Sequence, residues 1–487
     1  MKPLNELTIA EARELLDKGE ITSRALTEAC LTQIRSLDGA LHAFLEVYEK
    51  DALEAADRSD ERRTQDDGTM GRNPLDGIPV AIKDNMLLQG KPCTAGSKIL
   101  QGYTAAYDST AVRKLIESGA VILGRTNMDE FAMGSSTEHS AYGPTKHPRD
   151  PERVPGGSSG GSAVAVASNM CLGSLGSDTG GSIRQPASLC GVVGLKPTYG
   201  RVSRYGLMAM ASSLDQIGPF AKSAEDAATI LEVIQGQDAN DQTTSDAEPF
   251  QHSTFNIQHS SDLKGLKIGL PKQAWKSGGI EDRVREKTEE AVAELAKAGA
   301  ELVEIDLPYA DEALAVYYIL MPCEVSANLS RFDGMRYGLR KQGLPLFETY
   351  AQSRAEGFGD EVMRRILLGT FALSSGYIDA YYVRAKKVQT LIRQAYEKAF
   401  KEVDLIVTPT TPTTAFKLGE KLDDPVAMYL EDVFTVSINV AGVPAISMPC
   451  QDDGGMPVGI QLISSWFEEA KLLSVAKILE SQLKTKN

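Results

Sequence analysis

The chain has 487 residues, 42% of them hydrophobic, which is enough to form a large buried core. Its 51 basic and 66 acidic residues give a formal net charge of −15, and this charge argues against strong direct binding of nucleic acid by the chain alone. The charged first residues and the absence of any uncharged apolar run of about 18 residues predict neither export nor a membrane span.

Helical patterns open the chain. Thr8 and Glu11 form a capping-box pattern before a helical spacing of leucine and alanine, and residues 23–37 repeat this spacing, so the first 60 or so residues are predicted to be an α-helical lead-in. Residues 108–127 and 281–308 each combine a helical pattern, a glycine and an apolar strand pattern. This alternation predicts an α/β sheet fold.

Short apolar segments bounded by glycine and proline predict further buried strands at 77–83, 266–271, 404–410, 444–450 and 456–464, and a closing helix at 467–483. The polar segment 236–265 predicts a long surface loop. Residues 311–400 are richer in helical pattern and predict a helical layer over one edge of the sheet. Because the strand patterns continue along most of the chain, we expect a single domain over residues 1–487 rather than two.

Two segments rich in glycine and serine are the candidates for the chemistry: 155–167 (PGGSSGGSAVAVA) and 176–188 (GSDTGGSIRQPAS). Closely spaced glycines let several backbone N–H groups point at one spot, as an anion or an oxyanion requires. A flexible linker is the ordinary interpretation of such a run. The apolar helical pattern after the first segment, and Asp178 and Arg184 around Ser182 in the second, instead favour structured turns.

Two other kinds of site could use these glycines. A phosphate-binding loop would need a GK[ST] ending, which is absent. A nucleophile elbow fits Gly157 to Gly161 formally, with Ser159 as nucleophile, but it needs a histidine base. The histidines after Ser159 are His252 and His259, in or beside the polar segment, which makes a positioned base there improbable.

A lysine made neutral by burial can replace a histidine base. Lys83 ends the apolar strand pattern 77–83, so a strand would carry it inward. Its ordinary pKa of about 10.4 would have to fall by several units to be useful near neutral pH. A lone lysine at a strand end is more commonly a surface residue whose amine reaches solvent, and it is the surrounding motifs that favour the catalytic interpretation.

These motifs resemble the amidase signature family. The resemblance is carried by 77–85 (GIPVAIKDN) and by 156–197, and extends over essentially the whole chain. It implies the amidase signature fold, a mixed twisted β-sheet core covered by α-helices on both faces. It also implies that Lys83 is the base, Ser158 a proton bridge after a cis peptide bond, and Ser182 the nucleophile, with the backbone N–H groups of Thr179, Gly180 and Gly181 facing the oxyanion.

Within the family, segments 357–377 and 428–444 are similar to the glutaminase subunits of tRNA-dependent amidotransferases. This similarity implies that the substrate is glutamine. A tyrosine, an arginine and an aspartate would then bind its α-amino and α-carboxylate groups. Tyr318, Arg365 and Asp432 are the predicted residues, although the adjacent Tyr317 and Arg364 leave the register of the first two open.

The similarity further implies a heterotrimer with partner subunits B and C. Ammonia would pass to a partner that uses ATP and Mg²⁺ to amidate glutamate on tRNA(Gln), and in some organisms aspartate on tRNA(Asn), with the tRNA held mainly by the partner. We expect no cofactor or metal on this chain itself. Six scattered cysteines without zinc or disulfide spacing indicate a reduced, cytoplasmic environment.

Two other functions remain open. A free-standing amidase would use the same three residues on another amide and need no partner. A catalytically silent scaffold would keep the fold for assembly alone, but it would have no chemical need for Lys83, Ser158 and Ser182 together.

Overall fold

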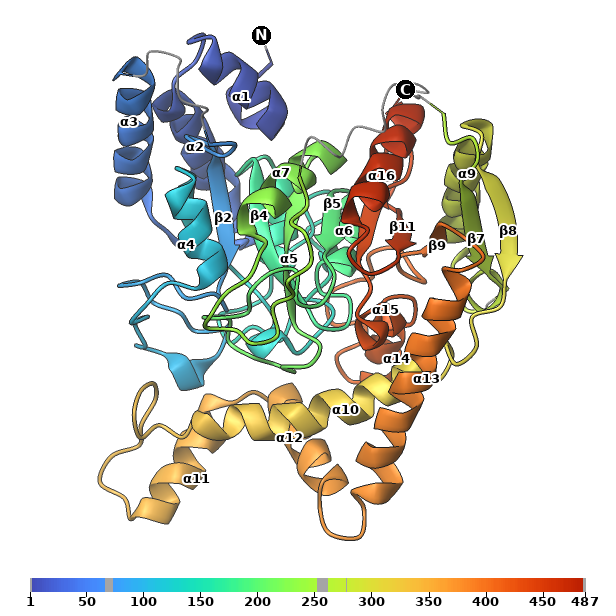
Figure 1. Cartoon of the computed structure of the whole chain (residues 1–487). Helices are drawn as coiled ribbons and strands as arrows, with labels where there is room; N and C mark the ends of the chain where they lie inside the picture. The colour runs from blue at the N-terminus through green and yellow to red at the C-terminus, as the bar shows by residue number, and fades with distance from the viewer. Residues whose placement is uncertain (1, 66–72, 252–261, 277, 485–487) are drawn as a thin grey trace.

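One eleven-stranded sheet runs through the molecule (Figure 1), in the order β1-β3-β2-β4-β6-β5-β10-β11-β9-β7-β8. The structure is a computed structural model that describes residues 2–65, 73–251, 262–276 and 278–484. The strands are β1 (Phe44–Val47), β2 (Pro79–Lys83), β3 (Val121–Thr126), β4 (Gly173–Asp178), β5 (Val193–Lys196), β6 (Gln216–Ala221), β7 (Lys267–Pro271), β8 (Glu301–Ile305), β9 (Leu405–Pro409), β10 (Ala445–Pro449) and β11 (Gly459–Ser464).

Parallel and antiparallel pairs both occur, so the sheet is mixed, as predicted. β2 is parallel to both β3 and β4, and β7 is parallel to β8 and β9. The strands between these two groups pair antiparallel. The carboxyl ends of β2 and β4 therefore meet at the same edge of the sheet, where polar side chains can be brought together.

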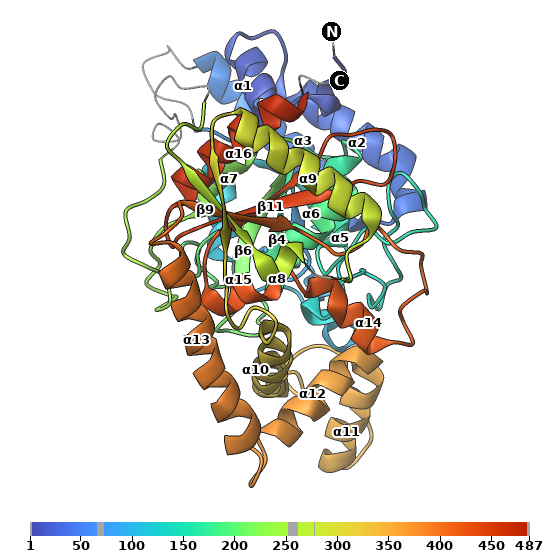
Figure 2. The same cartoon turned by 90° about the vertical axis from the view of Figure 1, so that its right-hand side faces the viewer.

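Helices cover both faces of the sheet (Figures 1 and 2). Two glycines of β4 show this: a Cβ added at Gly173 would meet Ile230 of α7, whereas one added at Gly176 would meet Ser159, next to α5. The predicted α/β fold is confirmed. The helices are α1 (Ile9–Asp17), α2 (Ser23–Leu41), α3 (Glu49–Gln65), α4 (Thr110–Glu117), α5 (Gly160–Ala167), α6 (Arg184–Cys190), α7 (Ala224–Ile234), α8 (Lys272–Trp275), α9 (Asp282–Lys297), α10 (Ala313–Asn328), α11 (Leu346–Gly357), α12 (Asp360–Ala372), α13 (Arg384–Ala399), α14 (Pro425–Tyr429), α15 (Val436–Ala441) and α16 (Glu469–Lys484).

The N-terminal segment differs from the prediction in one respect. Thr8 and Glu11 form the predicted capping box at the start of α1, and α2 covers the second helical pattern. The lead-in is not wholly helical, however, because β1 lies within it and pairs with β3 as the edge strand of the sheet. Four residues are too short to give a period-2 pattern that stands out from the flanking helices.

The polar segment 236–265 contains no helix or strand in its described parts, 236–251 and 262–265, in agreement with the predicted loop. His252 and His259 lie outside the described residues. The predicted helical layer is formed by α10 to α13 and lies at one end of the sheet (Figures 1 and 2). The continuous sheet supports the proposal of a single domain. Within the described ranges, no helix is both long and apolar enough to cross a membrane.

Candidate active site

Lys83 lies in the interior of the protein. It is the last residue of β2, which runs between β3 and β4, and its side chain is fully buried. A lysine is rarely buried in this way unless its nitrogen has specific polar partners. The strand predicted from the apolar run therefore carries this amine into the core, as the sequence suggested.

Three serine hydroxyls surround the Lys83 amine. Its Nζ lies 2.8 Å from Ser158 Oγ, 2.7 Å from Ser159 Oγ and 2.9 Å from Ser177 Oγ. Ser158 and Ser159 lie directly before α5, and the Gly157–Ser158 peptide bond is cis, as the resemblance implies. Ser177 lies on β4 beside β2, so the parallel pairing of these strands brings its hydroxyl to the amine.

The hydrogen bonds indicate which hydroxyl can give a proton to the amine. A neutral lysine amine has two N–H donors and one lone pair. Ser159 Oγ already donates to the Ser177 carbonyl at 3.1 Å, and Ser177 Oγ already accepts from Asn85 Nδ2 at 2.9 Å. Ser159 therefore fits as an acceptor of one N–H group, whereas Ser158 and Ser177 each keep a hydroxyl hydrogen that could point at the amine. In the proposed proton bridge, Ser158 donates this hydrogen to the lone pair.

Burial lowers the pKa of Lys83 to about 7, although Asp129, Asp178 and Asp215 act in the opposite direction. Removing an ammonium group from water favours its neutral form. This shift brings the pKa into the range where a neutral amine is accessible near neutral pH, as acceptance of a proton requires.

Ser182 lies in the turn between β4 and α6, and 8% of its surface is exposed. The carboxylate of Asp178 holds this turn, accepting from Gly181 N at 2.9 Å and from Ile183 N at 3.2 Å. Arg184 donates to the same carboxylate through Nε and Nη2, both at 3.0 Å. Burial alone would raise the pKa of Asp178, but Arg184 lowers it to about 2, so this anchor stays ionised.

The predicted oxyanion donors lie in this turn, with one difference. Because the Gly181 N–H donates to Asp178 Oδ1, it would have to share its hydrogen with an oxyanion. Gly180 is held from the other side, since its carbonyl accepts from Thr435 Oγ1 at 2.5 Å and an added Cβ would lie 2.6 Å from the Tyr317 ring. The N–H groups of Thr179, Gly180 and Gly181 remain the proposed donors, the last as a shared one.

The structure brings Tyr318, Arg365 and Asp432 together. The Tyr318 hydroxyl donates to Asp432 Oδ2 at 3.1 Å, and the guanidinium of Arg365 lies 5.5 Å from the centre of the Tyr318 ring. Burial raises the pKa of Asp432 to about 7. Burial would lower the pKa of Arg365, but Glu361 raises it above its usual value, so the arginine is charged. The group offers one cation and one carboxyl in a single place.

The adjacent residues Tyr317 and Arg364 lie elsewhere, which favours Tyr318 and Arg365 in the register left open by the sequence. Tyr317 packs against Gly180 and meets Tyr318 edge to face, with ring centres 5.0 Å apart. The Arg364 side chain is 41% exposed, compared with 3% for Arg365, and both pair with Glu361. Tyr318 and Arg365 are therefore the members of each pair that lie beside Asp432.

The sequence does not indicate the contacts that several residues of the site make. Ser159 and Ser177 complete the partners of Lys83, and Ser135 Oγ donates to Asp432 Oδ2 at 3.0 Å. Tyr429 stacks on Tyr318 with ring centres 4.0 Å apart, and its hydroxyl donates to Glu361 at 2.9 Å. Contacts of this kind, made by serines in or near glycine- and serine-rich segments and by a tyrosine on a short helix, match no sequence pattern, so only the tertiary structure identifies them.

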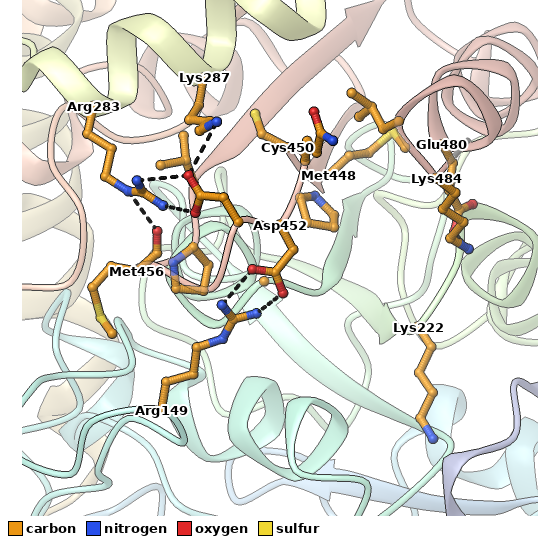
Figure 3. Close-up of a pocket in the computed structure, with 17 residues that line it drawn as sticks. Arg149, Lys222, Arg283, Lys287, Met448, Cys450, Asp452, Met456, Glu480 and Lys484 are labelled. Carbon is orange, nitrogen blue, oxygen red and sulfur yellow. Dashed lines mark hydrogen bonds and ion pairs between the residues drawn. The ribbon is translucent and has the colours of Figure 1, made fainter. Parts of the chain in front are cut away.

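A cavity of about 200 Å³ lies apart from these residues, beside the loop between β10 and β11 and near α9 and α16. Figure 3 shows Arg149 facing Asp452 of this loop, with which it pairs at 2.8 Å. Arg283 pairs with Asp453 of the same loop at 2.6 Å. These pairs join the loop to α9 and to the segment before Ser158 and Ser159. No group of three or more potential metal ligands occurs in the part of the chain that the structure describes.

The family model described as Amidase matches residues 25–473. The chain belongs to the amidase family. It is 51% identical over 471 residues to the A-subunit of glutamyl-tRNA(Gln) amidotransferase from Desulfatibacillum aliphaticivorans, with 96% of each chain covered. The crystal structure of a protein of that name from Thermotoga maritima is 41% identical, with a TM-score of 0.81 and 99% and 96% coverage. The peptide amidase of Stenotrophomonas maltophilia is 32% identical, with a TM-score of 0.82 and 99% and 98% coverage.

The lowered pKa of Lys83 predicts how amidase activity changes with pH. Protonated Lys83 cannot accept the Ser158 proton, so kcat for glutamine hydrolysis should rise as pH increases through about 7 and then level off. Lys83→Arg keeps a charge at every pH and should lower kcat by about 10² to 10⁴-fold throughout.

Lys196 provides the control, because burial lowers its pKa to about 7 as well, while its Nζ donates to the Pro197 carbonyl at 2.8 Å. The Lys196→Met variant should keep the rise in kcat near pH 7. If that rise disappeared in Lys196→Met and persisted in Lys83→Arg, Lys83 would not be the base.

Proposed function

We propose that the chain is the glutaminase subunit of a glutamyl-tRNA(Gln) amidotransferase. It hydrolyses glutamine to glutamate and ammonia, and partner subunits B and C complete a heterotrimer in the cytoplasm. The partner uses the ammonia, with ATP and Mg²⁺, to convert Glu-tRNA(Gln) to Gln-tRNA(Gln). The full-length similarity to proteins of that name supports the assignment. This chain's negative charge supports binding of the tRNA mainly by a partner.

One observation carries the choice of glutamine as the substrate: Arg365 and Asp432 lie together beside the nucleophile turn. Thr435 Oγ1 joins the two parts, since its single O–H lies within hydrogen-bonding distance of both the Asp432 carbonyl, at 3.0 Å, and the Gly180 carbonyl. A free amino acid carries one α-ammonium and one α-carboxylate, which need partners of opposite charge when buried. Arrival of the ammonium beside Asp432 would favour the ionised form of this carboxyl.

The proposed reaction uses three side chains in sequence. Neutral Lys83 takes the hydroxyl proton of Ser158 as Ser158 takes that of Ser182, and Ser182 Oγ forms a bond to the carboxamide carbon. The backbone N–H groups of the turn stabilise the oxyanion. Lys83 returns the proton through Ser158 to the nitrogen, the carbon–nitrogen bond breaks and ammonia leaves. Water then hydrolyses the glutamyl ester by the reverse proton transfers.

The function is tested by measuring glutamate release from glutamine with the chain alone and with subunits B and C. Ser182→Ala should lower the activity to background in both cases, because it removes the attacking oxygen. Ser168→Ala is the matched control, since its side chain shows the same exposed fraction, 8%, and lies at the far end of α5. Full activity in Ser182→Ala would contradict the proposed nucleophile. Hydrolysis of other amides but not of glutamine, with no effect of the partners, would favour a free-standing amidase.

The arginine pair tests recognition of the α-carboxylate. Arg365→Lys should raise KM for glutamine by about 10 to 100-fold, because a lysine cannot form the paired, charge-assisted hydrogen bonds of a guanidinium group. Arg364→Lys should change KM little. Hydrolysis of butyramide, which lacks both α-groups, separates recognition from structural damage. An equal loss of activity on glutamine and butyramide in Arg365→Lys would contradict the assignment.

A further inference from the structure

The helical layer carries a large exposed apolar surface. Its side chains come from α12 and from the turn and π-helix (Asp379–Val383) that lead to α13. Contacts of Phe371 with Tyr377 and Tyr381, with ring centres 4.5 and 5.9 Å apart, make the surface continuous. We call it the α12 patch, and its members with their exposed fractions are Leu367 69%, Leu368 46%, Phe371 47%, Tyr377 44%, Ile378 38% and Tyr381 39%.

Such a surface is unusual for a protein that stays alone in water. Scattered exposed apolar residues are ordinary, but a contiguous group of leucine and aromatic side chains marks a surface that another molecule covers. Residues 374–381 are all exposed, and Figures 1 and 2 show the turn between α12 and α13 extending from the molecule away from the sheet. The patch is therefore accessible to a second protein.

The opposite face of α12 belongs to the proposed glutamine site. Glu361, Arg365 and Gly369 recur every four residues and are buried, whereas Leu367, Leu368 and Phe371 point outward. A Cβ added at Gly369 would lie 1.8 Å from the Pro322 carbonyl of α10. This close packing fixes α12 against α10, the helix that carries Tyr318, so a protein bound to the outer face would hold both helices in place.

The charges beside the patch indicate the chemistry of its partner. Between residues 366 and 387 the basic residues are Arg384, Lys386 and Lys387 and the acidic residue is Asp379, and all four are exposed. This local excess of positive charge occurs in a chain whose net charge is −15. A complementary surface would be apolar at its centre and bordered by carboxylates.

We propose that the α12 patch is the docking surface for a partner subunit of the amidotransferase, one that presents an apolar surface bordered by carboxylates. The inference rests on the proposed function. Docking fixes the outer face of α12 and thereby orients Arg365 on its inner face. Binding of the partner then lowers KM for glutamine, which couples glutamine hydrolysis to assembly of the complex.

The test is binding of the purified B–C subcomplex to the full chain, with glutamine hydrolysis measured in parallel. The double variant Leu367→Asp, Phe371→Asp places two carboxylates on the patch. It should weaken binding at least 100-fold and abolish the fall in KM caused by the partners, with basal glutamine hydrolysis and the thermal unfolding midpoint unchanged. Phe347→Asp is the matched control, because Phe347 is 79% exposed on α11, away from the α12–α13 turn (Figure 1).

Wild-type binding by the double variant would overturn the proposal while leaving the glutaminase function intact. The proposal would also fall if the wild-type chain sedimented as a dimer, the double variant sedimented as a monomer, and both bound the partner equally well. The patch would then join two copies of this chain. A wild-type chain that neither hydrolysed glutamine nor bound the B–C subcomplex would refute the proposed function, and this inference with it.

Discussion

The arrangement of the candidate active site depends on one lysine amine that is excluded from solvent and hydrogen-bonded inside the protein. Lys83 has no access to solvent, so its nitrogen must find polar partners inside the protein, and three serine hydroxyls within 2.9 Å provide them. The same burial lowers the pKa of the amine to about 7. Burial thus favours the neutral amine of a residue that is ordinarily a cation, which suits its proposed role as a base without any histidine.

The two segments rich in glycine and serine, which follow Lys83 at different distances along the chain, supply the polar partners of its amine. β4 brings Ser177 to the amine and then ends at Asp178, whose carboxylate, paired with Arg184, holds the turn that contains Ser182. Asn439 Nδ2 donates to the same carboxylate at 2.8 Å, so α15 is joined to the turn as well. Segments far apart in the sequence are thereby fixed around the proposed nucleophile before any substrate binds.

The sequence predicts the parts of this arrangement that have a period or a motif. The capping box at Thr8, the strand that ends at Lys83 and the closing helix are all present. β1 was missed because four residues between two helices give too short a pattern. The hydroxyls of Ser159 and Ser177, and the stacking of Tyr429 on Tyr318, depend on the tertiary structure and have no local signature. Burial also favours Arg365 over Arg364 as the residue beside Asp432, a choice that their adjacent positions in the sequence left open.

The most direct measurement is an NMR titration of Lys83 in the intact chain labelled with [ε-¹³C]lysine, with the resonance assigned by its loss in Lys83→Arg. We predict that the Lys83 signal titrates with a pKa of about 7, because burial favours the neutral amine over its charged form. Titration near the ordinary lysine value of about 10.4 would mean that Lys83 is a permanent cation at neutral pH. It would contradict the role of Lys83 as the base.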